Sequence, residues 1–242
     1  MIEFRSVTKS FGTRTILKDL NLIIPKSKIV FILGMSGTGK SVLLKNIVGL
    51  LKPDSGELIV DDYQVHKLSE MEMMEVRKIC GMVFQQPALF DSLNVFENVA
   101  YGLRKHFSLP ENEVKEEVLE ALKLVGLAGV EQKYSHELSY GMKKRVSLAR
   151  TVALKPKILL FDEPTTGLDP ISTNRVNELI LDLSKTLGTT SVVVSHDMDS
   201  ALKVADHIVM LAEGKLLTQG SPEEMRNSQI PLVKEFLAEV AH

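Results

Sequence analysis

The apolar residues of this chain fall into short continuous runs that are separated by turn residues. Such runs cover residues 29–33, 158–161, 191–194 and 207–211. Runs of about four to eight residues bounded by turns are typical of strands that are buried on both faces, as in a parallel sheet. The pattern therefore predicts a mostly parallel sheet at the centre of the protein.

Other segments carry apolar residues at helical spacing or as further strands. Ser69 and Glu72 fit a capping box at the start of one of these helices. The helices expected on this basis cover residues 40–51, 69–78, 172–187, 198–205 and 231–240. Additional strands are expected over residues 2–7, 20–24 and 57–61. Strands alternating with helices predict an α/β fold.

The stretch from 87 to 156 has a different, helical character. A stripe of apolar residues predicts one helix over residues 111–125, with Gly126 as its stop, and a second helix follows over 141–154. We therefore expect one domain over 1–242, whose α/β core comprises 1–86 and 157–242 and is interrupted by a helical subdomain over 87–156.

Composition and charge narrow the possible partners and cellular location of the protein. Its 242 residues are 44% hydrophobic and 25% charged, as in an ordinary globular protein, and the net charge of −2 gives no case for a nucleic-acid partner. The single cysteine, Cys80, suits a reducing compartment. No apolar run reaches the roughly 20 residues that span a bilayer, and the N-terminus lacks the build of a signal peptide. We expect a cytosolic protein that another subunit would hold at any membrane.

A phosphate-binding loop follows the first buried strand and precedes a helix. Its eight residues match the pattern G-x-x-x-x-G-K-[ST] in the context that the motif requires. They are Gly34, Met35, Ser36, Gly37, Thr38, Gly39, Lys40 and Ser41. The glycines let backbone amides turn toward phosphate oxygens, Lys40 would neutralise the β- and γ-phosphates, and the Ser41 hydroxyl would bind Mg²⁺.

Polar residues at the ends of later strands fit the same chemistry. Asp162 and Glu163 end the strand over 158–161, at the edge of an α/β sheet where ligands bind. Asp162 would help to hold Mg²⁺, and Glu163 could polarise an attacking water. His196 ends another strand and could donate to the γ-phosphate, whereas Gln85 could contact Mg²⁺ or water.

A second candidate phosphate site lies outside this set. Ser139 and Gly141 stand at the start of a predicted helix, where free N–H groups favour an anion. Between them, Tyr140 would be strained if its position required a positive φ. The charge run 143–145 that follows indicates a solvated helix face. Asp169 fits a helix N-cap or a subunit boundary.

This ordered set resembles the nucleotide-binding subunit of ABC transporters over essentially the whole chain. The resemblance identifies Walker A at 34–41, the Q-loop at Gln85, the signature at 138–142, Walker B at 158–163, the D-loop at 167–169 and the switch histidine at His196. Phe11 falls where the family has an adenine-stacking aromatic residue. The resemblance implies a P-loop NTPase core with an N-terminal antiparallel β subdomain. It also implies ATP and Mg²⁺ as ligands, and a head-to-tail homodimer in which Ser139 and Gly141 serve the partner's ATP. Asp169 is expected in the nucleotide site at the subunit boundary.

Within the family the chain looks most similar to the Mla-type subunits of lipid transporters. This similarity rests on residues 90–100, the insertion 103–110 and the segment 142–145. It implies a place at the cytoplasmic face of a bacterial inner membrane, beneath MlaE-like permease subunits. An MCE-domain lipid-binding protein and a small STAS-like subunit are further expected partners.

Other readings remain open at this stage. The chain could energise transport of a different cargo, such as amino acids. A DNA-repair ABC protein is disfavoured because Lys40 and Ser139 are only 99 positions apart, with no sustained heptads between them. A translation factor of the family would carry two phosphate loops, and a small-molecule kinase would leave Ser139 and His196 without a joint purpose.

Overall fold

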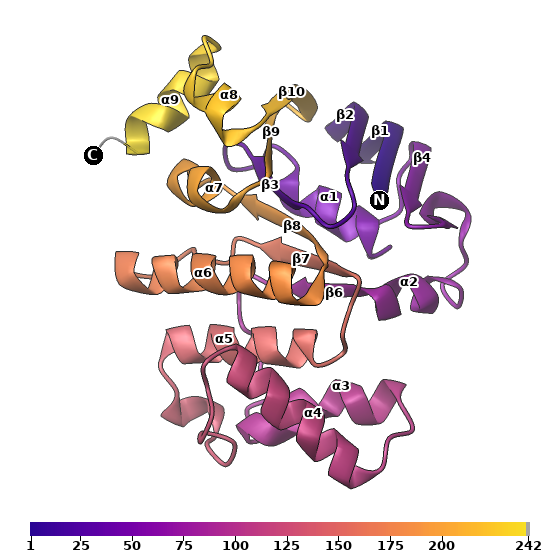
Figure 1. The fold of residues 1–242 in the computed structure, drawn as a ribbon. Coiled ribbons are helices and arrows are strands. Elements are labelled where there is room, and N and C mark those ends of the chain that lie inside the picture. The colour runs from indigo at the N-terminus through magenta and orange to yellow at the C-terminus, as the bar shows by residue number, and fades with distance from the viewer. Residues whose placement is uncertain (241–242) are drawn as a thin grey trace.

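The structure, a computed structural model, describes residues 1–240, which fold around two β-sheets (Figure 1). The larger sheet has the order β10-β9-β3-β8-β7-β6 and is parallel except for β10 at one edge. Its strands are β3 (Ile29–Leu33), β6 (Cys80–Val83), β7 (Ile158–Asp162), β8 (Thr190–Ser195), β9 (His207–Ala212) and β10 (Lys215–Gly220). The smaller, antiparallel sheet has the order β2-β1-β4-β5. Its strands are β1 (Ile2–Phe11), β2 (Arg14–Ile24), β4 (Ser55–Val60) and β5 (Tyr63–Gln64). This architecture confirms the predicted fold class.

The central strands separate two hydrophobic cores, because successive side chains of a strand point to opposite faces. In β3, Ile29, Phe31 and Leu33 belong to one core, whereas Val30 and Ile32 belong to the other. The first core is completed by helices on one side of the sheet, and the second by the antiparallel sheet and α1. Burial on both faces explains why these strands are continuously apolar.

The described helices are α1 (Lys40–Ile47), α2 (Met73–Ile79), α3 (Val95–His106), α4 (Glu111–Leu124), α5 (Tyr140–Val152), α6 (Pro170–Leu187), α7 (Met198–Val204), α8 (Pro222–Arg226) and α9 (Pro231–Val240), with 3₁₀ turns at Val65–Lys67 and Ser135–Glu137. Some of these helices pack against the large sheet, whereas α3 and α4 pack against other helices. In Figure 1, α3, α4 and α5 pack together at one end of the molecule, and α6 lies between them and the strands. None of the described helices is both long and apolar enough to cross a membrane.

Several predicted boundaries differ from the structure. The helix expected over 40–51 ends at Ile47, because Gly49 adopts φ 65°, a left-handed conformation that closes a helix. The capping contact between Ser69 and Glu72 forms, but the helix itself begins only at Met73. Strands β1 and β2 are longer than predicted, because register shifts interrupt the alternation that would have revealed their full length.

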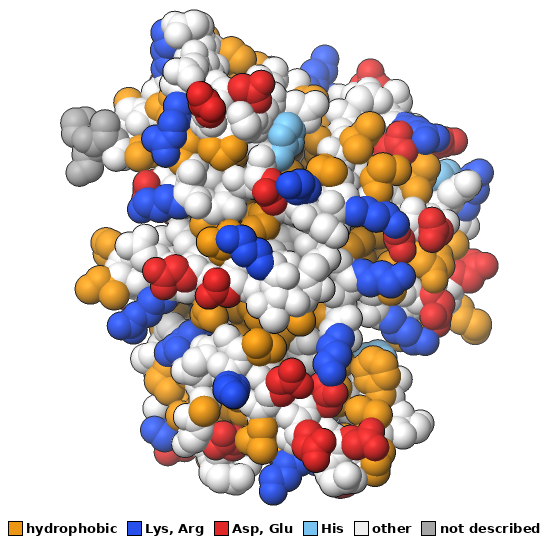
Figure 2. All heavy atoms as spheres, in the orientation of Figure 1, with side chains coloured by type: hydrophobic (Ala, Val, Ile, Leu, Met, Phe, Trp, Pro, Cys, Tyr) orange, Lys and Arg blue, Asp and Glu red, His pale blue; other side chains and the backbone are white. Residues whose placement is uncertain are grey.

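The surface carries charges of both signs. On the face drawn in Figure 2, Lys and Arg side chains are interspersed with Asp and Glu. This mixture agrees with the small net charge of −2 and gives that face no basic stripe of the kind that binds nucleic acid.

Candidate functional site

The glycine-rich loop joins β3 to α1, and its backbone is tightly enclosed. Gly39, at the N-cap of α1, has φ 103°, and a Cβ there would lie 2.8 Å from Leu17 Cδ2. A Cβ on Gly34 would lie 2.6 Å from the carbonyl oxygen of Leu211. Larger residues are therefore excluded at both positions. The loop can turn backbone N–H groups toward an anion at the helix N-terminus.

Lys40 begins α1, and its ammonium group reaches back over the loop. The side chain is only 7% exposed, and Nζ donates to the carbonyl oxygens of Gly34 (2.6 Å) and Met35 (3.2 Å). Nζ also lies 3.7 Å from Glu163 Oε1. Burial lowers the pKa of Lys40, and the nearby Glu163 carboxylate opposes that shift. The ammonium group is thus held between the loop and a carboxylate, where it can meet the charge of a phosphate.

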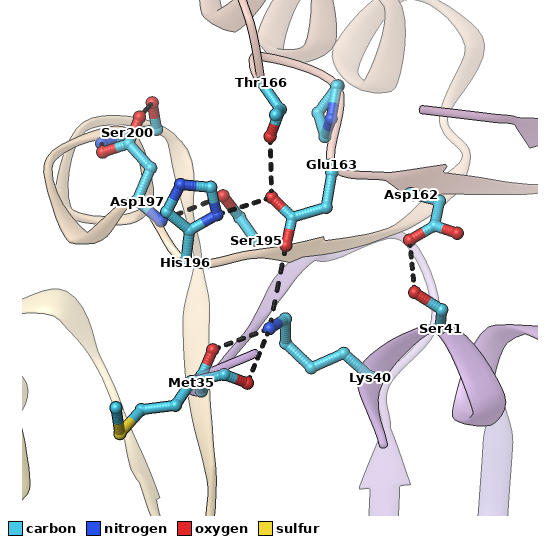
Figure 3. Close-up of polar contacts among 12 residues, drawn as sticks. Met35, Lys40, Ser41, Asp162, Glu163, Thr166, Ser195, His196, Asp197 and Ser200 are labelled. Atoms are coloured by element: carbon cyan, nitrogen blue, oxygen red, sulfur yellow. Dashed lines mark hydrogen bonds and ion pairs between the residues drawn. The ribbon is translucent and has the colours of Figure 1, made fainter. Parts of the chain in front are cut away.

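Ser41 and Asp162 come together although they are 121 residues apart. The Ser41 hydroxyl donates to Asp162 Oδ1 at 2.8 Å (Figure 3). Asp162 is the last residue of β7 and is buried, so its carboxylate is fixed at the carboxyl edge of the sheet. A hydroxyl and a carboxylate are hard oxygen ligands of the kind that Mg²⁺ prefers.

Glu163 follows β7 with a left-handed backbone, φ 51°, which is costly for a residue other than glycine. Its N–H donates to the Val194 carbonyl at 3.0 Å, and its Oε2 accepts from Thr166 Oγ1 at 2.9 Å. His196 Nδ1 lies 2.8 Å from the same Oε2 (Figure 3). These contacts aim the Glu163 carboxylate away from Asp162, toward Lys40 and His196.

A cavity of about 730 Å³ connects most of the predicted site residues, which is a size typical of small-molecule sites. Those that line it are Phe11, Met35, Ser36, Gly37, Gly39, Lys40, Ser41, Gln85, Glu163 and His196. Gly34 and Thr38 belong to the same loop, and Asp162 lies directly behind Ser41. One cavity thus joins the end of β1, the loop, and the segments that follow β6, β7 and β8.

The cavity also has walls that were not predicted. Arg14 and Ile16 from β2, Val42 from α1 and Thr166 line it, as do Glu235, Phe236 and Glu239 from α9. The apolar pattern indicated α9 as a helix but carried no signal for where it packs. Thr166 is the one of these that the sequence could have suggested, because it lies three positions after Glu163.

The sequence profile of the family described as ABC transporter matches residues 17–166. The chain belongs to the ABC transporter family. An intermembrane phospholipid transport ATP-binding protein, MlaF of Haemophilus influenzae, is 44% identical over 98% of this chain and 90% of its own length. MlaF of Escherichia coli K12 is 41% identical over 100% of this chain and 90% of its own. A probable ribonucleotide transport ATP-binding protein, mkl of Mycobacterium leprae, is 42% identical over 98% of this chain and 68% of its own.

Solved ABC structures agree with this assignment. A dimeric structure of the ATP-binding cassette MJ0796, in a post-hydrolysis state with ADP and Pi, superimposes with a TM-score of 0.84 at 33% identity. It covers 92% of this chain and 99% of its own. The structure of cbiO1 from Clostridium perfringens, part of the ABC transporter complex cbiONQ, has a TM-score of 0.86 at 32% identity and covers 98% of each chain. The protein is therefore an ATP-binding and ATP-hydrolysing ABC subunit.

Three predicted residues of this ABC ATPase lie away from the cavity. Ser139 is exposed and caps α5, with Oγ accepting from the Met142 N–H at 3.3 Å. Gly141 follows in the first turn of α5, and a Cβ added there would meet nothing within 4 Å. Asp169 caps α6 by accepting from the N–H groups of residues 171 and 172 at 3.0 Å, so its predicted capping role is confirmed.

The charge run in α5 departs from expectation. Lys144 is buried, with 7% of its surface exposed, so the prediction that residues 143–145 form one solvated face is wrong for Lys144. The reason is that a loop far along the sequence, 164–166, covers it. The possible strain at Tyr140 is absent, because Tyr140 is the first residue of α5 and is not among the described residues with a positive φ.

Proposed function

We propose that two copies of this ABC ATPase form a head-to-tail dimer in which each ATP lies between the phosphate loop of one chain and Ser139 and Gly141 of the other. The observation that carries this proposal is the open start of α5. A glycine inside a helix costs about 0.5–1 kcal/mol relative to alanine, and nothing in the chain's own fold requires one at Gly141. The open space and the capped helix start suit an anion from outside the chain. The dimeric state of the ATP-binding cassette MJ0796 supports dimerisation of this chain.

We further propose roles for the residues that line the cavity. The loop 34–41 and Lys40 would hold the β- and γ-phosphates, and Mg²⁺ would be held by Ser41, Gln85 and Asp162. The existing contact of 2.8 Å between Ser41 and Asp162 supports this ligand set, because Mg²⁺ takes few protein ligands and completes its shell with phosphate oxygens and waters. When bound, Mg²⁺ neutralises charge that develops on the transferred phosphoryl group.

Glu163 would be the general base in this scheme. Its carboxylate is held by Thr166 and by His196 at 2.9 and 2.8 Å, which leaves Oε1 directed toward the side of the cavity that holds Lys40. A carboxylate fixed in this way can orient a water and accept its proton. His196 would donate to the γ-phosphate. We propose that His196 gives up its contact with Glu163 when it does so.

Phe11→Ala is expected to weaken ATP binding by about 5- to 150-fold, because stacking of a base on an aromatic ring is worth about 1–3 kcal/mol. The Phe11 ring is 47% exposed and lines the cavity, so adenine can reach it. Titration of the purified chain with ATP would measure the effect. Inorganic tripolyphosphate, which has no base, should bind wild type and variant equally, and Phe11→Tyr should bind ATP as wild type does. A matching loss for tripolyphosphate would contradict the stacking role.

For the whole assembly, we propose a peripheral ATPase at the cytoplasmic face of a bacterial inner membrane. It would drive MlaE-like permease subunits that move phospholipid with an MCE-domain protein and a small STAS-like subunit. Residues 87–156 would be the helical subdomain that contacts the permease, with 1–86 and 157–242 as the nucleotide-binding core, of which 241 and 242 lie outside the described residues. The names and 90% coverage of the two MlaF proteins support phospholipid as cargo. The name of the mycobacterial relative favours ribonucleotide as the alternative.

Purification of the native complex in detergent would decide between these cargoes. We expect permease subunits and an MCE-domain protein to copurify with the chain, together with bound phospholipid detected by mass spectrometry. A complex that carries a substrate-binding receptor for nucleotides or amino acids, and no enriched phospholipid, would contradict the lipid assignment. It would leave the ATPase assignment intact.

A further inference from the structure

Lys144 is a buried cation whose partners are backbone carbonyls. It lies in the second turn of α5, and Nζ donates to the carbonyl oxygens of Pro164 at 2.8 Å and Thr166 at 2.9 Å. No carboxylate within residues 1–240 approaches Nζ to within 4.0 Å. A buried charge needs such partners, because removal of either would leave it unsatisfied at a cost of several kcal/mol. The helix start and the loop after Glu163 are therefore tied to each other.

Burial also changes the pKa of Lys144. It lowers the pKa of Lys144 to about 8, and the charge of Glu163 acts in the opposite direction. The ammonium thus experiences the Glu163 carboxylate although the two do not touch. Its attachment through hydrogen bonds to backbone, rather than through an ion pair, fixes a segment of chain and not a single side chain.

Thr166 connects the buried Lys144 ammonium to the Glu163 carboxylate. Thr166 accepts from Lys144 through its carbonyl and donates from Oγ1 to Glu163 Oε2 at 2.9 Å. Figure 3 shows this threonine above the carboxylate and His196 to the left of it, with both side chains contacting the same oxygen. Because Glu163 has a strained backbone with φ 51°, its position depends on the contacts around it. A shift of Lys144 would therefore reach the carboxylate through Thr166.

Tyr140 extends the same cluster to the segment that holds Gln85. It lies one turn before Lys144, and Nζ is 5.3 Å from the centre of its ring, within the range of a cation–π contact. Its hydroxyl lies 3.4 Å from the Gln85 carbonyl oxygen and 3.5 Å from Gln86 Oε1, which are long contacts. The ring thus covers the buried ammonium and brings the start of α5 against a segment that lines the cavity.

We propose that Lys144, with the Tyr140 ring over it, is a positioning residue that couples the start of α5 to Glu163 of the same chain. The proposal rests on the head-to-tail dimer proposed above. When the partner's ATP binds against Ser139 and Gly141, α5 is fixed in place, and Lys144 transmits this through 164–166 to the carboxylate that acts on the chain's own ATP. Each ATP thereby promotes hydrolysis of the other.

A dimer of two differently substituted chains can distinguish the proposed positioning of Glu163 by Lys144 from a local effect of Lys144 on the signature, residues 138–142. One chain carries Glu163→Gln, so that ATP is hydrolysed only in the cavity of the other chain. Lys144→Met is then introduced into either the hydrolysing chain or the silent one, with differently tagged chains purified as mixed dimers. Methionine replaces the buried ammonium with an apolar side chain of similar length, a change that buried sites often tolerate.

The coupling predicts an asymmetric result. Lys144→Met in the hydrolysing chain should lower kcat by about 5- to 150-fold, the usual size of coupling between sites, with ATP affinity unchanged. The same change in the silent chain should leave kcat within about twofold of the unmodified mixed dimer. Lys144→Arg, which retains the charge and several donors, should keep most of the activity. Lys143→Met, the neighbouring lysine, should have no effect in either chain.

Other outcomes would overturn the inference. Equal kcat in all mixed dimers would mean that Lys144 positions nothing that matters for hydrolysis. A larger loss when Lys144→Met lies in the silent chain would assign the residue to the shape of the signature alone. A fall in melting temperature with a parallel loss of ATP binding would make it a structural residue. If wild-type and Glu163→Gln chains form no dimer with ATP, the proposed function itself fails, and that result is distinct from the other three.

Discussion

Glu163→Gln is expected to bind ATP normally and to hydrolyse it about 10²- to 10⁴-fold more slowly. That range is the usual contribution of a general base. Glutamine keeps the size of the side chain and one oxygen that can accept from Thr166, so the fold and the cavity should be retained. It cannot take a proton from water at neutral pH. Single-turnover hydrolysis and ATP titration of the purified variant would measure the two quantities separately.

Glu178→Gln is a matched control for this experiment. Glu178 is exposed on α6 and does not line the cavity, so kcat should not change. Near-normal turnover in Glu163→Gln would remove Glu163 from the catalytic role. A loss of ATP binding equal to the loss of rate would instead indicate that the carboxylate supports Lys40, from which it lies 3.7 Å away.

The parts of the site that lie close together in sequence could be predicted in detail. The phosphate loop is eight consecutive residues, and its glycines occupy positions where the structure has no room for a side chain or requires a positive φ. The pairing of Ser41 with Asp162 could also be anticipated, because both residues follow buried parallel strands and the carboxyl ends of such strands share one edge. The chemistry at the carboxyl edge of a parallel sheet could therefore be predicted from the sequence.

Features that depend on packing between distant segments could not be predicted. A helical charge run predicts exposure, yet the segment 164–166 folds over Lys144 and buries it. Met71, Met73 and Met74 lie within four positions of one another, yet only Met73 is buried, whereas Met71 is 84% exposed. The packing of α9 against the cavity likewise brings together segments that are far apart in the sequence. In each case the deciding neighbour comes from another part of the chain, which local periodicity does not report.

Ser139→Arg is expected to block the ATP-driven dimer while ATP binding by the single chain is retained. In the proposed dimer, Ser139 faces the partner's phosphates, and an arginine side chain would fill the open space at the start of α5. We expect dimer affinity to fall by about 30-fold or more, the size of a hot-spot loss. Sedimentation of the variant in a Glu163→Gln background, with and without ATP, would measure this loss.

The change also removes a helix cap, and that effect has to be separated from the loss of the interface. Loss of the cap at Ser139 should cost about 1 kcal/mol of stability, too little to unfold the chain. Ser221 is a matched control, because its hydroxyl caps α8 in the same way, accepting from the Glu224 N–H at 3.2 Å. Ser221→Arg should cost similar stability and leave the dimer intact. If Ser221→Arg weakens the dimer as much, or if Ser139→Arg weakens ATP binding by the single chain, then Ser139 does not serve the partner's ATP. The start of α5 would then be a structural element of its own chain, and Gly141 would have no explanation in the dimer.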